Sequence, residues 1–139
     1  MKYLKTFTVL LILFVVSCKK DNDPVSEADR IRQLLTTGAW NVTQVMVDGM
    51  PTDVYDGLTI RFTATTIIAG NGEPLWPASV GWSFVDETAK AIQRSDGISI
   101  DIVSISENGL TIELVWDNTT LAGGKRGSIA GEHRFDFVH

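Results

Sequence analysis

The sequence predicts an all-β fold, an eight-stranded antiparallel up-and-down barrel with one short N-terminal helix. Beyond Trp40, apolar and polar residues alternate in successive short runs, so each run has one dry face and one wet face. Asp-Gly and Asn-Gly dipeptides, which tolerate the positive φ of tight hairpins, stand between several runs. Hairpins in series form a meander, and closing it into a barrel leaves no exposed edge. The same strands also suit a two-sheet β-sandwich, because periodicity alone does not separate these two folds.

The strands are predicted from the alternating runs and their boundaries from the turns between them. In the first run, Val45 and Val47 are out of step with Trp40 and Val42, which predicts a β-bulge in this strand. The predicted strands cover residues 39–47, 57–63, 65–69, 79–85, 89–94, 98–105, 110–116 and 128–138. The turn dipeptides are Asp48-Gly49, Asn71-Gly72, Asp96-Gly97 and Asn108-Gly109.

A short amphipathic helix is predicted before the first strand. Ser26 is a hydroxyl N-cap, and Asp29, three residues on, is well placed on the helix dipole. Gly38 provides a stop signal before the first strand. Apolar residues recur at helical spacing between these signals, at Ala28, Ile31, Leu34 and Leu35. Because a lone helix of this length is marginal in water, its apolar stripe needs a surface to pack on.

The N-terminus has the layout of a secretory signal. Lys2 and Lys5 provide positive charge, and residues 7–16 form an apolar run before the small Ser17. The run is shorter than the about 20 apolar residues that span a bilayer, which argues against a permanent transmembrane helix.

Cys18 is the only cysteine of the 139 residues, and it follows the apolar run directly. The stretch Val15, Val16, Ser17 and Cys18 resembles the lipobox of bacterial lipoproteins, in which the cysteine is acylated and becomes the first mature residue. Exported proteins occupy an oxidising space where a lone thiol is a liability, and acylation removes that liability. The alternative is a plain signal peptide followed by an incidental cysteine.

These features divide the chain into a signal peptide (1–17), the lipidated Cys18 with a polar tether (18–25), and a barrel domain (26–139). Within the tether, residues 19–24 span about 20 Å at about 3.3 Å per residue. Residues 19–23 resemble the charged export tag of lipoproteins of the Bacteroidetes type, which implies the outer face of the outer membrane; a short linker without any address function stays open. The expected location is the cell envelope, anchored by lipid in the outer membrane and either periplasmic or surface-exposed.

The charge of the mature chain argues against nucleic acid as a partner. Removing residues 1–17 lowers the basic total from 12 to 10 against 17 acidic residues, so the net charge shifts from −5 to −7. An acidic surface repels phosphate backbones. The expected partners are therefore the membrane, through the lipid anchor, and either a small hydrophobic ligand or an envelope protein.

Gly38-Ala39-Trp40, at the junction of helix and first strand, resembles the Gly-x-Trp signature of the lipocalin and calycin barrels. Together with the strand pattern over about residues 33–138, it resembles the small lipocalin-like domains of Bacteroidetes lipoproteins. The resemblance implies that Trp40 fills the closed end of the barrel and that Arg134, on the last strand, lies across its indole. Yet Arg134 alternates with Phe135 and Phe137, so if those two point inward Arg134 should point outward as a surface charge.

Two functional roles stay open. A lipid-tethered binding module would hold a small apolar molecule in the barrel mouth, whereas an interaction protein would have a filled barrel and meet another envelope component. An eight-stranded barrel is only just wide enough for its own side chains or one small ligand. Large rings are expected to point inward at Trp40, Phe62, Trp82, Phe84, Trp116, Phe135 and Phe137. Tyr55 and Trp76, in loops, are the predicted contacts for a ligand or partner, although Trp76 could equally anchor its own loop in the core.

Catalysis finds little support in the sequence. The chain has two histidines, His133 and His139, which are not at metal-ligand spacing, and it contains no Gly-x-Ser-x-Gly motif. Asp48, Asp53 and Asp56 do not have the spacing of a calcium loop. We therefore expect no catalytic residue, no metal site and no cofactor.

A Cys18→Ser variant tests the anchor. It is expected to leave the membrane fraction and to stop incorporating labelled fatty acid, because several acyl chains at about 0.8 kcal/mol per buried methylene supply the membrane affinity. Fractionation and metabolic labelling measure both effects. Membrane retention of the variant would contradict the lipid anchor.

Overall fold

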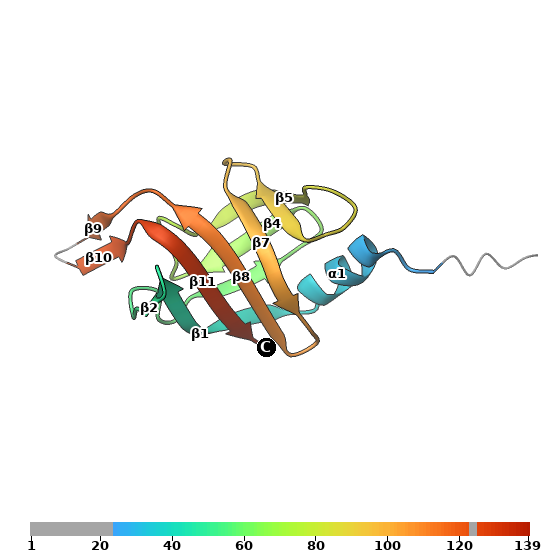
Figure 1. Cartoon of the computed structure of the whole chain (residues 1–139), viewed down its shortest axis with the longest axis horizontal. Coiled ribbons are helices and arrows are strands. Elements are labelled where there is room, and N and C mark those ends of the chain that lie inside the picture. Colours follow the sequence, from blue (N-terminus) through green and yellow to red (C-terminus); the bar gives the residue numbers. More distant parts are fainter. Residues whose placement is uncertain (1–23, 123–124) are drawn as a thin grey trace, which may run out of the picture.

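The computed structural model describes residues 24–122 and 125–139, so Cys18 and most of the tether lie outside the described residues. One antiparallel sheet has the order β11-β8-β7-β6-β5-β4-β3-β1 and closes through pairing of β1 with β11 (Figure 1). The closed barrel confirms the predicted fold over the sandwich alternative. Its strands are β1 (Ala39–Val47), β3 (Thr59–Phe62), β4 (Thr66–Gly70), β5 (Ser79–Phe84), β6 (Ala91–Arg94), β7 (Ser99–Ile105), β8 (Gly109–Trp116) and β11 (Gly131–Val138).

Three further strands lie outside the closed barrel. The short β2 (Met50–Pro51) extends the ladder beside β1. The strands β9 (Thr120–Ala122) and β10 (Lys125–Ser128) form a separate hairpin between β8 and β11. The sequence pattern predicted a plain loop here and a last strand from residue 128, which is wrong: the barrel strand begins only at Gly131.

Turns and irregularities follow the sequence signals. Asp48 and Gly49 have φ of 49° and 79°, the left-handed pair that a tight hairpin needs. The register of β1 against β11 shifts between Val42 and Gln44, which confirms the predicted bulge. Because the bulge reverses the alternation, Trp40 and Val45 both point into the barrel.

The helix α1 (Glu27–Leu35) covers one end of the barrel (Figure 1), which we call the helix end; it also includes the turn 106–108 and His139. The amide of Asp29 donates to the Ser26 hydroxyl, as the predicted N-cap requires. Ile31 and Leu35 are buried, and the Arg32 guanidinium lies 5.1 Å from the centroid of the Trp82 ring. Tertiary packing therefore holds a helix of nine residues that would be marginal alone. The described residues contain no helix long and apolar enough to cross a membrane.

Aromatic and aliphatic side chains fill the barrel. The rings of Phe62 and Trp82, and those of Phe135 and Trp76, meet edge to face with centroids 5.4 and 5.5 Å apart. Two of the expected interior rings, Phe84 and Trp116, are only half-buried. Phe137 is buried and stacks on Phe135.

Trp40 is buried under α1 at the helix end, as the resemblance to lipocalins implied. Its indole N–H donates to the Leu35 carbonyl at 3.0 Å, and the His139 ring stacks on it with centroids 3.8 Å apart. Gly38 joins α1 to β1 without a left-handed φ, and a Cβ there would only touch the His139 ring at 3.5 Å. The junction therefore does not require glycine for its backbone conformation.

Arg134 lies on the outer face of β11, where its side chain is 45% exposed and pairs with Glu113 at 3.2 Å. The expectation that it covers Trp40 is corrected: alternation along β11 sends Phe135 and Phe137 inward and Arg134 outward. His139, from one residue beyond the strand, lies on the Trp40 ring instead.

His139→Ala and Arg134→Ala separate these two roles. His139→Ala should lower the free energy of unfolding by about 1–2 kcal/mol, because it removes an aromatic stack and two hydrogen bonds. Arg134→Ala should change it by less than about 0.5 kcal/mol, since an exposed ion pair contributes little. Thermal unfolding followed by circular dichroism measures both, with about 4 °C expected per kcal/mol. A larger effect of Arg134→Ala would contradict this assignment.

Candidate functional site

The end of the barrel opposite α1 is covered by loops rather than by a helix. We call it the loop end; it comprises the Asp48-Gly49 turn, the loops 52–58 and 71–78, and the described residues 117–122 and 125–130 (Figure 1). Tyr55 and Trp76 lie here, and their exposed fractions are 1% and 0%. The expectation that they present rings to a ligand or partner is therefore corrected: both loops fold their aromatic residue into the core. Trp76 is the core anchor that the sequence left as an alternative.

Tyr55 belongs to a chain of hydrogen bonds inside the loop end. His133 Nδ1 lies 3.0 Å from the Gly131 carbonyl, which can only accept, so Nδ1 carries the hydrogen. The Tyr55 hydroxyl donates to His133 Nε2 at 2.9 Å and accepts from the Ile129 amide at 3.3 Å. When His133 is neutral, each N–H and O–H group in this series of hydrogen bonds therefore has one acceptor.

Burial sets the ionisation of this pair. Burial lowers the pKa of His133, outweighing the Gly131 carbonyl and the Asp48 carboxylate, which both favour the imidazolium. Burial also raises the pKa of the Tyr55 phenol, and the Ile129 amide partly opposes this shift. Both side chains are therefore neutral at neutral pH.

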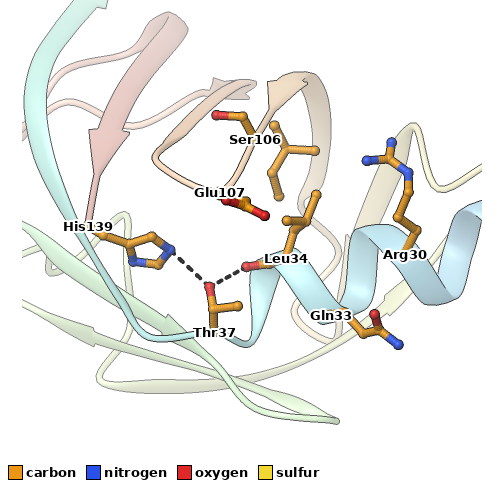
Figure 2. Close-up of a pocket in the computed structure, with 8 residues that line it drawn as sticks. Arg30, Gln33, Leu34, Thr37, Ser106, Glu107 and His139 are labelled. Atoms are coloured by element: carbon orange, nitrogen blue, oxygen red, sulfur yellow. Dashed lines mark hydrogen bonds between the residues drawn. The ribbon is translucent and has the colours of Figure 1, made fainter.

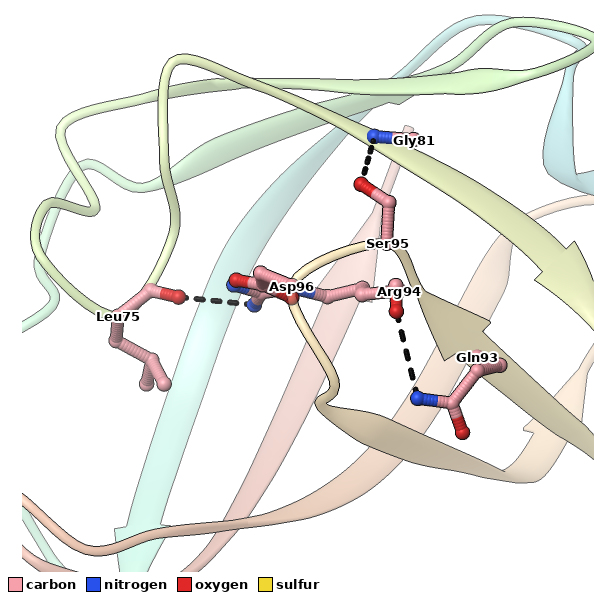
Figure 3. A network of polar contacts seen from close by, with 6 residues as sticks. All are labelled: Leu75, Gly81, Gln93, Arg94, Ser95 and Asp96. Carbon is pink, nitrogen blue, oxygen red and sulfur yellow. Dashed lines mark hydrogen bonds and ion pairs between the residues drawn. The ribbon is translucent and has the colours of Figure 1, made fainter.

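A buried arginine fixes the second loop of this end (Figure 3). The Arg94 side chain is fully buried, and its guanidinium donates to the Leu75 carbonyl at 2.9 Å and to both carboxylate oxygens of Asp96. It also lies 5.4 Å from the centroid of the Trp76 ring. Arg94 thus ties the loop 71–78 to the turn after β6.

Asp96 is the counter-charge of this buried cation. Partial burial tends to raise the pKa of Asp96, but the hydrogen bonds and charge of Arg94 outweigh it, so the pKa lies below its usual value. Its contribution to stability is present above about pH 4 and is lost as the pH falls through the lowered pKa.

A cleft lies at the helix end, in a groove between α1 and the turn 106–108. Its volume is about 770 Å³, which is in the range of small-molecule sites. Leu34 and Ile105 are its apolar residues. Polar lining comes from Arg30, Gln33, Thr37, Ser106, Glu107 and His139, most of them drawn in Figure 2.

Hydrogen bonds order the inner wall of this groove. The Thr37 hydroxyl donates to the Leu34 carbonyl at 2.8 Å, and Thr37 Oγ1 lies 2.9 Å from His139 Nε2 (Figure 2). His139 Nδ1 donates to the Ala39 carbonyl at 3.0 Å. The guanidinium of Arg30, at the outer rim, is paired with Glu27.

The clefts between described residues are lined mainly by surface and end residues rather than by the aromatic residues of the core. Four clefts between described residues have volumes of about 310 to 770 Å³, and no Phe, Tyr or Trp lines any of them. Within residues 24–122 and 125–139, no three His, Cys, Asp or Glu side chains are grouped to hold a metal ion.

The sequence contained signals for two polar residues that the prediction left out. His133 has the parity of Phe135 and Phe137, and Arg94 has that of Ile92, so alternation places both side chains inside the barrel. The alternation along the strands could not predict that His139 stacks on Trp40, because His139 lies beyond the last strand.

Comparisons with protein-family models, with curated proteins and with solved structures found no match to this chain.

Replacing Arg94 and Asp96 one at a time tests whether losing the carboxylate destabilises the protein more than losing the guanidinium. Asp96→Asn leaves a buried guanidinium that cannot lose its proton, so we expect a loss of about 2–4 kcal/mol in unfolding free energy. Arg94→Met should cost less, about 1–2 kcal/mol, because Asp96 is 37% exposed and can be hydrated. Asp101→Asn, an exposed carboxylate on β7, is the control and should stay within about 0.5 kcal/mol. Urea unfolding measures all three; equal effects of Asp96→Asn and Asp101→Asn would refute the role of the pair.

Proposed function

We propose that this chain is a lipid-anchored, non-catalytic interaction protein of the cell envelope, built on a lipocalin-like barrel with a filled core. The observation that carries the proposal is the packing of the interior. Trp76, Phe62, Phe135 and Phe137 occupy the space that a ligand would need, and α1 and the loops cover the two ends. A barrel of eight strands leaves room for either side chains or a ligand, and here side chains take it.

The surface of the loop end supports a protein partner. Met50, at the β1–β2 hairpin, and Leu121, in β9, are 71% and 75% exposed. Both project from the end opposite α1, and hence from the end away from the proposed tether (Figure 1). Because the mature chain carries a net charge of −7, a partner with a basic surface is favoured.

The groove at the helix end supports a second candidate, a small-molecule binding protein. Its volume suits a small ligand, and Leu34 and Ile105 offer apolar contact beside the hydroxyl groups of Thr37 and Ser106. Such a ligand would bind outside the barrel, next to the proposed tether, and not in the barrel mouth.

Native mass spectrometry of the protein purified without detergent distinguishes the two candidates. The interaction protein should give the mass of the chain with its covalent lipid and nothing more. A co-purified small molecule would favour the second candidate instead. Its loss in a Leu34→Arg variant, which fills the groove, would assign it there, and its retention would point to another site. Val115→Arg, at an exposed position on β8, is the matched control.

A further inference from the structure

The loop 52–58 is held on the loop end by the buried side chains of Tyr55 and Leu58 and by two backbone hydrogen bonds to β1. The Thr52 amide donates to the Val45 carbonyl, and the Val42 amide donates to the Leu58 carbonyl, both at 3.0 Å. Among these contacts, the one made by the Tyr55 hydroxyl depends on protonation.

The Tyr55 ring packs edge to face on Phe135, with centroids 5.4 Å apart. Its hydroxyl is the one described side-chain group of this loop that hydrogen-bonds across to β11. Two hydrogen bonds link the loop 52–58 to neighbouring loops: the Asn71 side-chain amide donates to the Gly57 carbonyl at 3.1 Å, and the Ile129 amide donates to the Tyr55 hydroxyl at 3.3 Å.

We propose that the loop 52–58 is an acid-released cover over the loop end of the barrel, held closed at neutral pH by the Tyr55 hydroxyl donating to His133. Acid changes the direction of that bond. When Nε2 gains a proton it can only donate, so Tyr55 Oη must accept from both His133 and Ile129. The hydroxyl hydrogen then has no acceptor among the described contacts of Tyr55.

The surroundings of His133 offer little to hold its positive charge. Across the ladders it lies opposite Val47 on β1 and Leu114 on β8, both buried and apolar. Its ring stacks on Phe135 with centroids 5.7 Å apart. Asp48 is the charged group that favours the imidazolium, but its carboxylate already accepts from the Glu132 amide at 2.9 Å.

Glu132 and Arg134, the chain neighbours of His133, are exposed on the outer face. They therefore do not face the ring directly. A buried imidazolium in this setting is relieved most simply by releasing Tyr55 and admitting water.

Release of Tyr55 uncovers aromatic surface. Phe135 loses one of its two edge-to-face partners, Tyr55, while the other, Trp76, stays at a centroid distance of 5.5 Å next to the opening. The buried indole N–H of Trp76 has no acceptor among the described residues, so water that enters would satisfy it. The acid form would thus present an aromatic contact surface that the neutral form hides.

Hydrogen exchange measures the opening directly. In the full-length protein in detergent micelles, the protection factors of amides in 52–58 should fall as the pH drops below about 6.5. Opening is coupled to the uptake of one proton by His133, so the protection factors should fall by up to tenfold per pH unit. The fall ends at the pH where His133 is also protonated in the closed form. The turn 106–108 at the helix end serves as the internal reference and should not respond.

Three variants test whether His133 causes the pH-dependent loss of protection. His133→Gln keeps an acceptor for Tyr55 but cannot become charged, so its protection should stay constant with pH. His139→Gln replaces the other histidine of the chain and should retain the pH response of the native protein. Tyr55→Phe keeps the ring without the hydroxyl and should show lower protection of 52–58 than the native protein at pH 7.5, because the hydrogen bond to His133 is lost.

If the protection factors of His133→Gln fall with pH as in the native protein, the proposal is overturned, because carboxylate groups and not His133 would then control the opening. Constant protection in the native protein from pH 7.5 to about 4.5 would overturn it as well. Where His133→Gln does not fold, an NMR titration of the native protein replaces it. The His133 ring and the Ile129 amide must then shift with one midpoint, and separate midpoints, or a His133 that does not titrate, contradict the cover.

Discussion

The pairing of β1 with β11 is the constraint on which the rest of this structure depends. It joins the first and last barrel strands, from the pair of Asn41 with Val138 to the pair of Val47 with His133. The barrel sheet is thereby left with no open edge. Closure also turns every alternate side chain toward a common axis. In a barrel of eight strands these side chains meet, and aromatic residues such as Phe62 and Phe135 then fill the interior. A binding function such as the one proposed would therefore use the ends and the outer surface of the barrel.

The two ends are closed by different physical means. At the helix end the cover is mainly apolar: Ile31, Leu35 and the stacked pair Trp40–His139 exclude water. The loop end is closed by buried aromatic and aliphatic side chains together with buried polar groups, above all Arg94 and His133. Buried polar groups are costly unless every donor and acceptor is matched, so a change of one proton or one charge acts more strongly there.

Local patterns fixed the strands of this chain more reliably than the roles of its loops. Period-two alternation located the barrel strands to within about two residues at most ends, and the parity break at Val45 located the bulge. Tyr55 was misplaced and Trp76 was left between two positions, because the burial of a loop residue depends on which distant strand it meets, here β11 carrying Phe135. The short hairpin β9–β10 was missed for a similar reason, since glycines and charges mask its pairing in the sequence.

The two ends differ in whether the indole N–H groups of the four tryptophans have hydrogen-bond acceptors. The indole N–H groups of Trp40 and Trp82 donate to the carbonyls of Leu35 and Thr63, both at the helix end and both at 3.0 Å. Those of Trp76 and Trp116, at the loop end, are buried without an acceptor among the described residues. Each such group costs about 1–3 kcal/mol in the closed state, and hydration would recover part of that cost. Hydration of these two indole N–H groups would offset part of the cost of exposing the loop end, which agrees with the release of the loop 52–58 proposed there.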